Sequence, residues 1–229
     1  RTADNASALV DITNTGNVGI GVTPTRNLVV KGAGTDASLL LQNSSTGVTS
    51  TDGVLLQSNS NNSYLWNYES GDMILATNNA ERMRINAAGI VTKPNQPAFG
   101  ANATTTNIPI TTQTTVTLNE RFDVGGNLAN NVFTAPVTGK YLITYMFYFD
   151  NVDTAHTVLD VTLVTSNKFY QQTFKPSILL SSDGPFSVSS SSVCDMAAGD
   201  TAYIRVYVAG GTAQTDIHGD STASCYLLG

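Results

Sequence analysis

Short apolar runs separated by polar turns fill the first hundred residues, whereas the remainder alternates apolar and polar positions over longer stretches. In the first part, Asn, Gly, Ser and Thr interrupt every apolar run within about five or six residues, the usual length of a β-strand. The runs lie at residues 39–42, 54–57, 64–68, 73–76 and 82–85. This pattern predicts a chain of short strands with hardly any helix.

One strand–turn–strand phrase occurs twice in this part. Residues 9–21 and residues 83–91 each contain the apolar end of a strand and then a small polar turn that ends in glycine. A β-branched residue then begins the next strand. Repeated strand–turn units are typical of elongated proteins. One copy of the segment has few large side chains to offset its ordering entropy, whereas several copies wound together would bury more apolar area. We therefore predict a repetitive β shaft over residues 1–94, with a flexible Ser/Asn/Gly linker as the alternative.

Residues 92–97 contain two prolines and separate the two parts of the chain. Beyond them the predicted strands are longer, and apolar and polar residues alternate with period two. Residues 201–208 carry a core face of alanine and β-branched residues, and a second face with two tyrosines. Residues 139–149 are apolar on both faces, so they need a second covering layer, which is either the same chain or a neighbouring subunit. The pattern predicts a β-sandwich over residues 95–229. If a neighbour covers it, the predicted subunit interface comprises Tyr141, Tyr145, Phe147, Tyr203 and Tyr207.

Charged residues make up only 12% of the 229 residues, whereas roughly a quarter is usual in a soluble protein. The surface must therefore be rich in Asn, Ser, Thr and Gly, which suits packing against copies of the same chain. The net charge of −6 gives no basic stripe, so we expect no nucleic-acid partner. We also expect no membrane insertion, because no apolar run reaches about 18 residues. The abrupt start at Arg1, without a secretory signal, indicates a fragment of a longer protein.

The two cysteines, Cys194 and Cys225, are too few for a disulfide scaffold. Two buried free thiols in neighbouring strands are the favoured interpretation. A single disulfide is the alternative if those strands are adjacent. The sequence contains no paired-cysteine zinc motif, so we expect no zinc.

Both histidines lie beside carboxylates in stretches that read as loops. The two groups are Asp150, Asp153 and His156, and Asp216, His218 and Asp220. Loop carboxylates suit calcium and imidazole suits a transition metal, so the second group is a candidate metal site. The competing interpretation is that acidic residues occur in loops because loops are solvated.

Catalytic motifs are missing from the sequence, which has neither a Gly-x-Ser-x-Gly elbow nor a His-Glu-x-x-His helix. Glu69 with Asp72, or Glu120 with Asp123, would suit a glycosidase only at the correct carboxylate separation. We therefore expect no enzymatic activity, and a polysaccharide depolymerase is the least favoured alternative.

Three phrases of the first part stand out: residues 17–24, 28–30 and 80–85. Together they resemble the repeat phrases of tailed-bacteriophage tail fibres and related virion proteins, over nearly all of residues 9–91. The resemblance implies an extracellular virion protein that contacts other tail proteins. Similar phrases occur in bacterial surface proteins, so a bacterial adhesin is an alternative.

Several phrases of the second part also stand out: residues 97–101, Phe122-Asp123 with Asn127 and Asn131, residues 132–141, Gly199-Asp200 and residues 224–229. Together they resemble the globular head of complement subcomponent q and its tumour-necrosis-factor-like relatives, over residues 97–229. The resemblance implies a ten-stranded jelly roll that forms a homotrimer, with both chain ends at its base. It also implies a possible calcium ion, although no cofactor is required. The loops expected at the apex are residues 150–156, 176–184 and 210–222.

These observations predict an all-β homotrimer that forms the distal part of a phage tail fibre or spike. The apical loops, with the six Asp and His residues named above, would bind a host cell-surface glycan or outer-membrane receptor. Weak sugar sites suffice when three copies act together. A purely architectural fibre or decoration protein is the first alternative.

Overall fold

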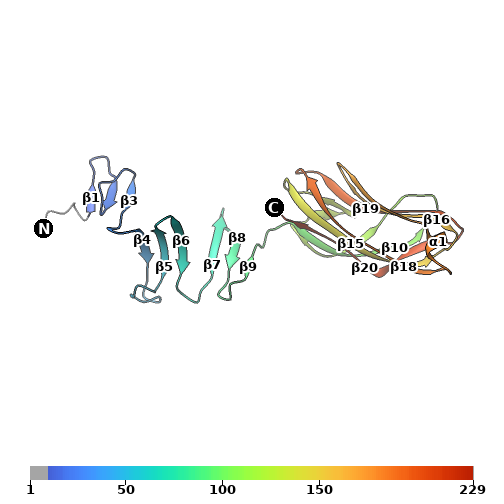
Figure 1. Ribbon diagram of the computed structural model, residues 1–229, viewed down its shortest axis with the longest axis horizontal. Coiled ribbons are helices and arrows are strands. Elements are labelled where there is room, and N and C mark those ends of the chain that lie inside the picture. The colour runs from blue at the N-terminus through green and yellow to red at the C-terminus, as the bar shows by residue number, and fades with distance from the viewer. Residues whose placement is uncertain (1–9, 229) are drawn as a thin grey trace, which may run out of the picture. The chain divides into compact units, whose positions relative to one another are not determined.

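The computed structural model describes residues 10–228 and consists of strands joined by turns, with 61% strand and 2% helix, which confirms the all-β prediction (Figure 1). The chain divides into two compact units between Lys93 and Pro94. Within the described residues, no helix has the length and apolar character needed to cross a bilayer. Each of the two units has its own packing.

The N-terminal unit contains three separate three-stranded sheets. The strands are β1 (Val10–Ile12), β2 (Val18–Ile20) and β3 (Leu28–Val30); β4 (Asp36–Leu41), β5 (Val54–Asn59) and β6 (Asn62–Asn67); and β7 (Met73–Thr77), β8 (Ala80–Ile85) and β9 (Val91–Thr92). All neighbours are antiparallel except β2 and β3. Of the described residues up to Lys93, only Gly19, Pro24 and Gly53 are buried. No sheet of this unit therefore covers a core with its own chain.

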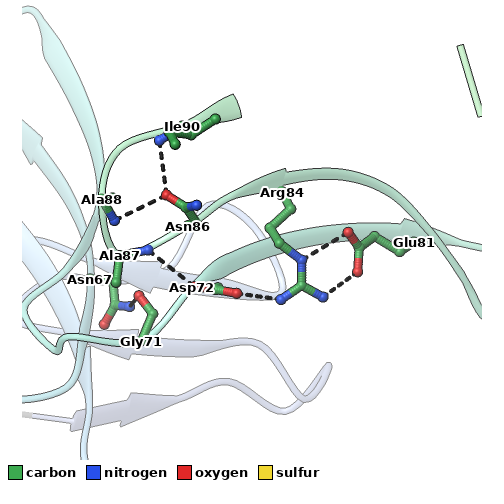
Figure 2. Close-up of polar contacts among 9 residues, drawn as sticks. All are labelled: Asn67, Gly71, Asp72, Glu81, Arg84, Asn86, Ala87, Ala88 and Ile90. Carbon is green, nitrogen blue, oxygen red and sulfur yellow. Dashed lines mark hydrogen bonds and ion pairs between the residues drawn. The ribbon is translucent and has the colours of Figure 1, made fainter. Parts of the chain in front are cut away.

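The repeated phrase forms the same turn in both copies. The amide of Gly16 donates to the carbonyl of Thr13 at 3.0 Å, and the amide of Gly89 donates to that of Asn86 at 2.8 Å. The two glycines have φ of +82° and +81°, which other residues rarely adopt. In each copy, the side-chain oxygen of the first turn residue also accepts a hydrogen bond from the backbone N–H of the residue after the glycine. Asn17 donates to Thr13 in the first copy, and Ile90 donates to Asn86 in the second. Figure 2 shows this bond from Ile90 to Asn86. The sequence repeat is thus a structural repeat.

The C-terminal unit is a β-sandwich, as predicted, and its two sheets have five and six strands (Figure 1). The five-stranded sheet has the order β12-β10-β20-β15-β18, and the other has the order β13-β14-β19-β16-β17, with β11 paired to β19. The strands are β10 (Ala98–Ile108), β11 (Thr114–Thr115), β12 (Thr117–Val124), β13 (Leu128–Ala129), β14 (Val132–Thr134), β15 (Gly139–Val152), β16 (His156–Thr165), β17 (Phe169–Phe174), β18 (Gly184–Met196), β19 (Thr201–Gly210) and β20 (Thr215–Leu227), with one helical turn, α1 (Pro176–Leu179). This order gives the jelly-roll architecture.

The core lies between these sheets and explains the doubly apolar strand β15. Tyr141, Tyr145 and Phe147 point inward and are at most 4% exposed, packed by other buried residues of the same chain. Their assignment to a subunit interface is therefore wrong. Alternation with period two places Met146 and Tyr148 on the opposite face, where they are 52% and 37% exposed. The face of β15 that lacks a cover is thus the one bearing Met146 and Tyr148.

The alternation predicted for β19 is confirmed, because Ile204 and Val206 are buried while Tyr203, Arg205 and Tyr207 are only half-buried. Tyr203 and Tyr207 are half-buried on the outward face of the six-stranded sheet. They therefore lie on the other side of the sandwich from Met146.

The two cysteines are free and buried, as favoured from the sequence. Cys194 lies opposite Tyr141 on one side of β15, and Cys225 lies opposite Ile143 on the other. Their strands thus flank β15, and the expectation of neighbouring strands was wrong. Burial raises the pKa of both thiols, that of Cys225 to about 12, so both stay protonated near neutral pH.

Candidate functional site

The connections that contain the predicted site residues gather at one end of the sandwich. Strand β15 begins beside the end of the chain, where Tyr141 lies opposite Leu227, and ends where Asp150 lies opposite Asp216. The side-chain amide of Gln96 donates to the Leu227 carbonyl at 2.8 Å, which connects the start of the unit to its end. The β15–β16 and β19–β20 connections therefore lie far from both chain ends of this unit, as predicted.

Asp153 fastens these two connections together. One carboxylate oxygen accepts the Ala155 amide at 2.7 Å, and the other accepts the amides of Thr212 at 2.9 Å and Ala213 at 3.1 Å. These bonds lower the pKa of Asp153 to about 2. Glycine is strongly favoured at position 211, because its φ is +70° and a Cβ would overlap the Asp153 carboxylate. Asp153 is thus a structural anchor.

His156 is fully buried beneath the same connections. Its Nδ1 lies 2.6 Å from the Gly210 carbonyl and its Nε2 lies 3.1 Å from the Thr215 hydroxyl, so both ring nitrogens have internal partners. Asp153 itself is only 7% exposed. The prediction that Asp153 and His156 contact a receptor is therefore wrong, because their polar atoms serve the fold.

Asp216 is also engaged within the chain. Its Oδ1 accepts the Asn107 amide at 2.6 Å, and its Oδ2 lies 3.4 Å from Asn151 Nδ2. Asp216, His218 and Asp220 lie in strand β20, not in the loop expected there, and the register against β10 and β15 is irregular along this stretch. In the part of the chain that the structure describes, no three metal-ligating side chains form a group. The predicted trio is thus not assembled within one chain, and a calcium ion stays a prediction.

Three of the six predicted residues share one open pocket of about 410 Å³. Asp150, His218 and Asp220 line it together with Met146, Tyr148 and Ser187. The His218 ring meets the Tyr148 ring edge-on, with 5.7 Å between centroids. His218 Nδ1 lies 3.3 Å from Asp220 Oδ2, and the two side chains are 48% and 89% exposed. The pocket thus offers an aromatic ring, carboxylates and a hydroxyl to a ligand.

Sequence reasoning missed Met146, Tyr148 and Ser187 as members of this pocket. The available signal was period-two alternation, which separates Tyr148 from the buried Phe147 on β15, and Ser187 from the buried Val188 on β18.

The outward side of β15, β18 and β20 between this pocket and the Lys140–Asp195 pair is called the outer face from here on. Its members are half-buried or exposed: Leu142, Thr144 and Met146 on β15; Ser189, Ser191 and Val193 on β18; and Thr222, Ser224 and Tyr226 on β20. None of these side chains is charged. The ion pair of Lys140 and Asp195, 2.6 Å apart, lies at the opposite end from the pocket. Surfaces depleted of charge at their centre are typical of protein–protein interfaces.

A scan against protein-family models found no match, and a search of curated proteins found none either. Among solved structures, the chain is similar to the globular domain of zebrafish complement 1qA protein, with 17% identity and a TM-score of 0.44 over 58% of this chain and 98% of that one. It is also similar to murine APRIL, with 13% identity and a TM-score of 0.42 over 58% of this chain and 99% of that one.

Proposed function

We propose that this chain is a structural attachment protein, the distal part of a phage tail fibre or spike, which works as a homotrimer and binds a glycan on the host cell surface. The C-terminal unit associates through its outer face. The observation that carries the proposal is that this face is free of charge and exposes apolar side chains, although the core of the unit is already filled.

The outer face supports self-association through its composition. Met146 and Val193 are 52% and 53% exposed, and Tyr226 is 44% exposed. Burying such a side chain fully is worth about 1.5–3 kcal/mol, so a few of them stabilise an assembly measurably. The hydroxyls of Thr144 and Ser224 already bond to each other at 2.8 Å, so covering them does not strand an unpaired polar group.

The pocket beside His218 supports the attachment role. In a trimer joined through the outer face, three pockets surround one end of the shared interface. Tyr148 offers a ring for the apolar face of a sugar, while Asp150 and Asp220 accept hydrogen bonds from its hydroxyls. Each site binds weakly, and three sites on one particle raise the avidity. The virion setting and the contact with other tail proteins rest on the repeat phrases of the N-terminal unit.

Native mass spectrometry of Met146→Asp tests the self-association. The charge would have to be buried without a partner, so we expect loss of the trimer with the monomer still folded. Phe169→Asp is the matched control, because Phe169 is 62% exposed on the other sheet. A Met146→Asp protein that stays trimeric would remove the outer face from the proposal.

Binding to a panel of immobilised bacterial lipopolysaccharides tests the attachment role. The double variant His218→Ala/Asp220→Ala should lose binding while staying trimeric, and Asp195→Ala, beyond the end of the outer face that lies away from the pocket, should bind normally. Unchanged binding by the double variant would exclude the pocket. A trimer that binds neither lipopolysaccharide nor bacterial cells would favour the purely architectural fibre.

A further inference from the structure

The sheet β4-β5-β6 of the N-terminal unit has two chemically distinct faces. In its antiparallel register, Leu39, Leu56 and Leu65 lie opposite one another and share one face, and Leu41 with Val54 forms the next row on it. These five side chains, which we call the aliphatic face, are between 37% and 60% exposed. No charged residue of the three strands lies on this side. Such a face resembles a core that lacks its second layer.

The opposite side, which we call the aromatic face, carries rings and polar groups. Leu55, Gln57, Tyr64, Trp66 and Tyr68 line a shallow groove of about 190 Å³ there. The rings of Trp66 and Tyr68 lie 6.1 Å apart between centroids. The Gln57 amide lies 3.3 Å from the Asp36 carboxylate. Tyrosine and tryptophan have a polar group that can meet water, which leucine and valine lack.

We propose that the aliphatic face is a second self-association surface, covered by the same sheet of another copy, while the aromatic face stays in water. The inference rests on the self-association of the proposed function and not on receptor binding. It adds that the N-terminal unit completes its core with side chains from its partners.

A second copy fits this face better than another occupant does. A face of aliphatic rows without charge selects a partner of the same kind, because charged or polar surfaces would lose hydration without gaining a bond. An open hollow of about 330 Å³ adjoins this face and is lined by Leu28, Val30, Ala37, Leu39 and Leu56 together with Ser38, Gln57, Ser58 and Ser63. The chain's own side chains leave it unfilled, so leucines of a second copy can enter it. Association of the C-terminal units raises the local concentration of these sheets and favours their pairing.

Thiol labelling of two neighbouring positions in the full-length chain tests the proposal. Leu56 and Gln57 are consecutive on the central strand β5, so Leu56→Cys samples the aliphatic face and Gln57→Cys samples the aromatic face. Cys194 and Cys225 are at most 1% exposed, so each introduced thiol is the main target of a maleimide. In the native protein we expect Gln57→Cys to react readily and Leu56→Cys to lose its reactivity until denaturant is added. Equal reactivity of the two variants overturns the proposal.

Trp66 gives a second readout that needs no substitution, because it is the only tryptophan of the chain. We expect acrylamide to quench its fluorescence nearly as well in the native as in the denatured protein. A Trp66 shielded from acrylamide would show that the aromatic face is covered and would overturn the assignment of the faces.

The native mass of the same samples separates this proposal from the proposed function. A trimer whose Leu56→Cys thiol reacts freely contradicts only the role of the aliphatic face. A monomer with a reactive thiol contradicts the self-association on which both proposals rest.

Discussion

The two units of this chain are built from similar strands but differ in where their apolar side chains lie. In the C-terminal unit, two sheets face each other and bury large side chains such as Phe133, Phe147 and Leu159 almost completely. In the described part of the N-terminal unit, three small sheets bury none of their leucines, and Leu41 and Leu56 are 60% and 56% exposed. A sheet is stable when a second layer covers its apolar face. The C-terminal unit contains that layer, whereas we propose that the N-terminal unit receives it from another copy.

Phe147→Ala should have the largest effect on the stability of either unit. Phe147 is fully buried between the sheets and stacks on Tyr145 with 4.9 Å between centroids. Removing such a ring costs roughly 3–5 kcal/mol. Urea unfolding of the C-terminal unit, followed by its tyrosine signals, measures the loss. Leu56→Ala is the comparison from the other unit and should leave that transition unchanged; a similar shift in both variants would contradict the separate cores.

Gly211→Ala should destabilise the C-terminal unit by roughly 1–3 kcal/mol, because it forces a side chain into a strained backbone region. The new methyl group would also push the Asp153 carboxylate away from the Thr212 and Ala213 amides. Gly184→Ala is the matched control, since its Cβ would meet nothing closer than 3.9 Å. Thermal denaturation of both variants measures the difference in stability. Equal melting temperatures would show that the backbone beside Asp153 tolerates a side chain at position 211.

Acid should loosen the connections that Asp153 holds. The pKa of this carboxyl is lowered from 3.8 to about 2 in the folded chain, so its stabilisation is complete above pH 3.8 and is lost as the pH falls through about 2. Asp153→Asn removes this contribution at all pH values. We expect the melting temperatures of wild type and variant to differ at about pH 6 to 7, where the Asp153 carboxyl is ionised, and to converge in acid. A constant difference down to pH 2 would contradict this role.

Arg84→Met should have the smallest effect. Figure 2 shows the guanidinium held by Asp72 and Glu81 on the β7–β8 hairpin, and these partners raise its pKa. Surface ion pairs of this kind contribute little and are screened by salt. We expect a slight fall in the melting temperature of the N-terminal unit at low ionic strength and no difference in 1 M salt, where the Debye length is about 3 Å. A large, salt-independent loss would indicate a packing role for the Arg84 stem.

The sequence was sufficient to predict local structure, but it predicted burial only where the two faces of a strand differ in polarity. The repeated turn could be predicted because its glycines and polar residues act within five positions, as in the bonds from Gly16 to Thr13 and from Gly89 to Asn86. The two faces of β19 followed from alternation. On β15 both faces are apolar, so the pattern could not decide between Tyr145 and Met146 as the core residue, and only the packing of the second sheet decided it.

The site was less predictable because long-range contacts determine it. The partners of His156, Gly210 and Thr215, lie 54 and 59 residues further along the chain, so its complete burial leaves no local signal. The small and polar residues from Gly219 to Thr222 resemble a loop, but Ile217 on one side and Ser221 and Thr222 on the other pair with β10 or β15, so the stretch belongs to strand β20. Asp150, His218 and Asp220 were predicted as site residues, and the structure brings them to one pocket.

The native mass of the unmodified chain, measured over a series of concentrations, tests the central claim most directly. We propose that the aliphatic face of the β4-β5-β6 sheet and the outer face of the sandwich are both covered by other copies of the chain. We predict a trimer that persists on dilution. A folded monomer at all concentrations would contradict the account, because the leucines of β4 to β6 and the outer face of the sandwich would then be stable in water without a partner.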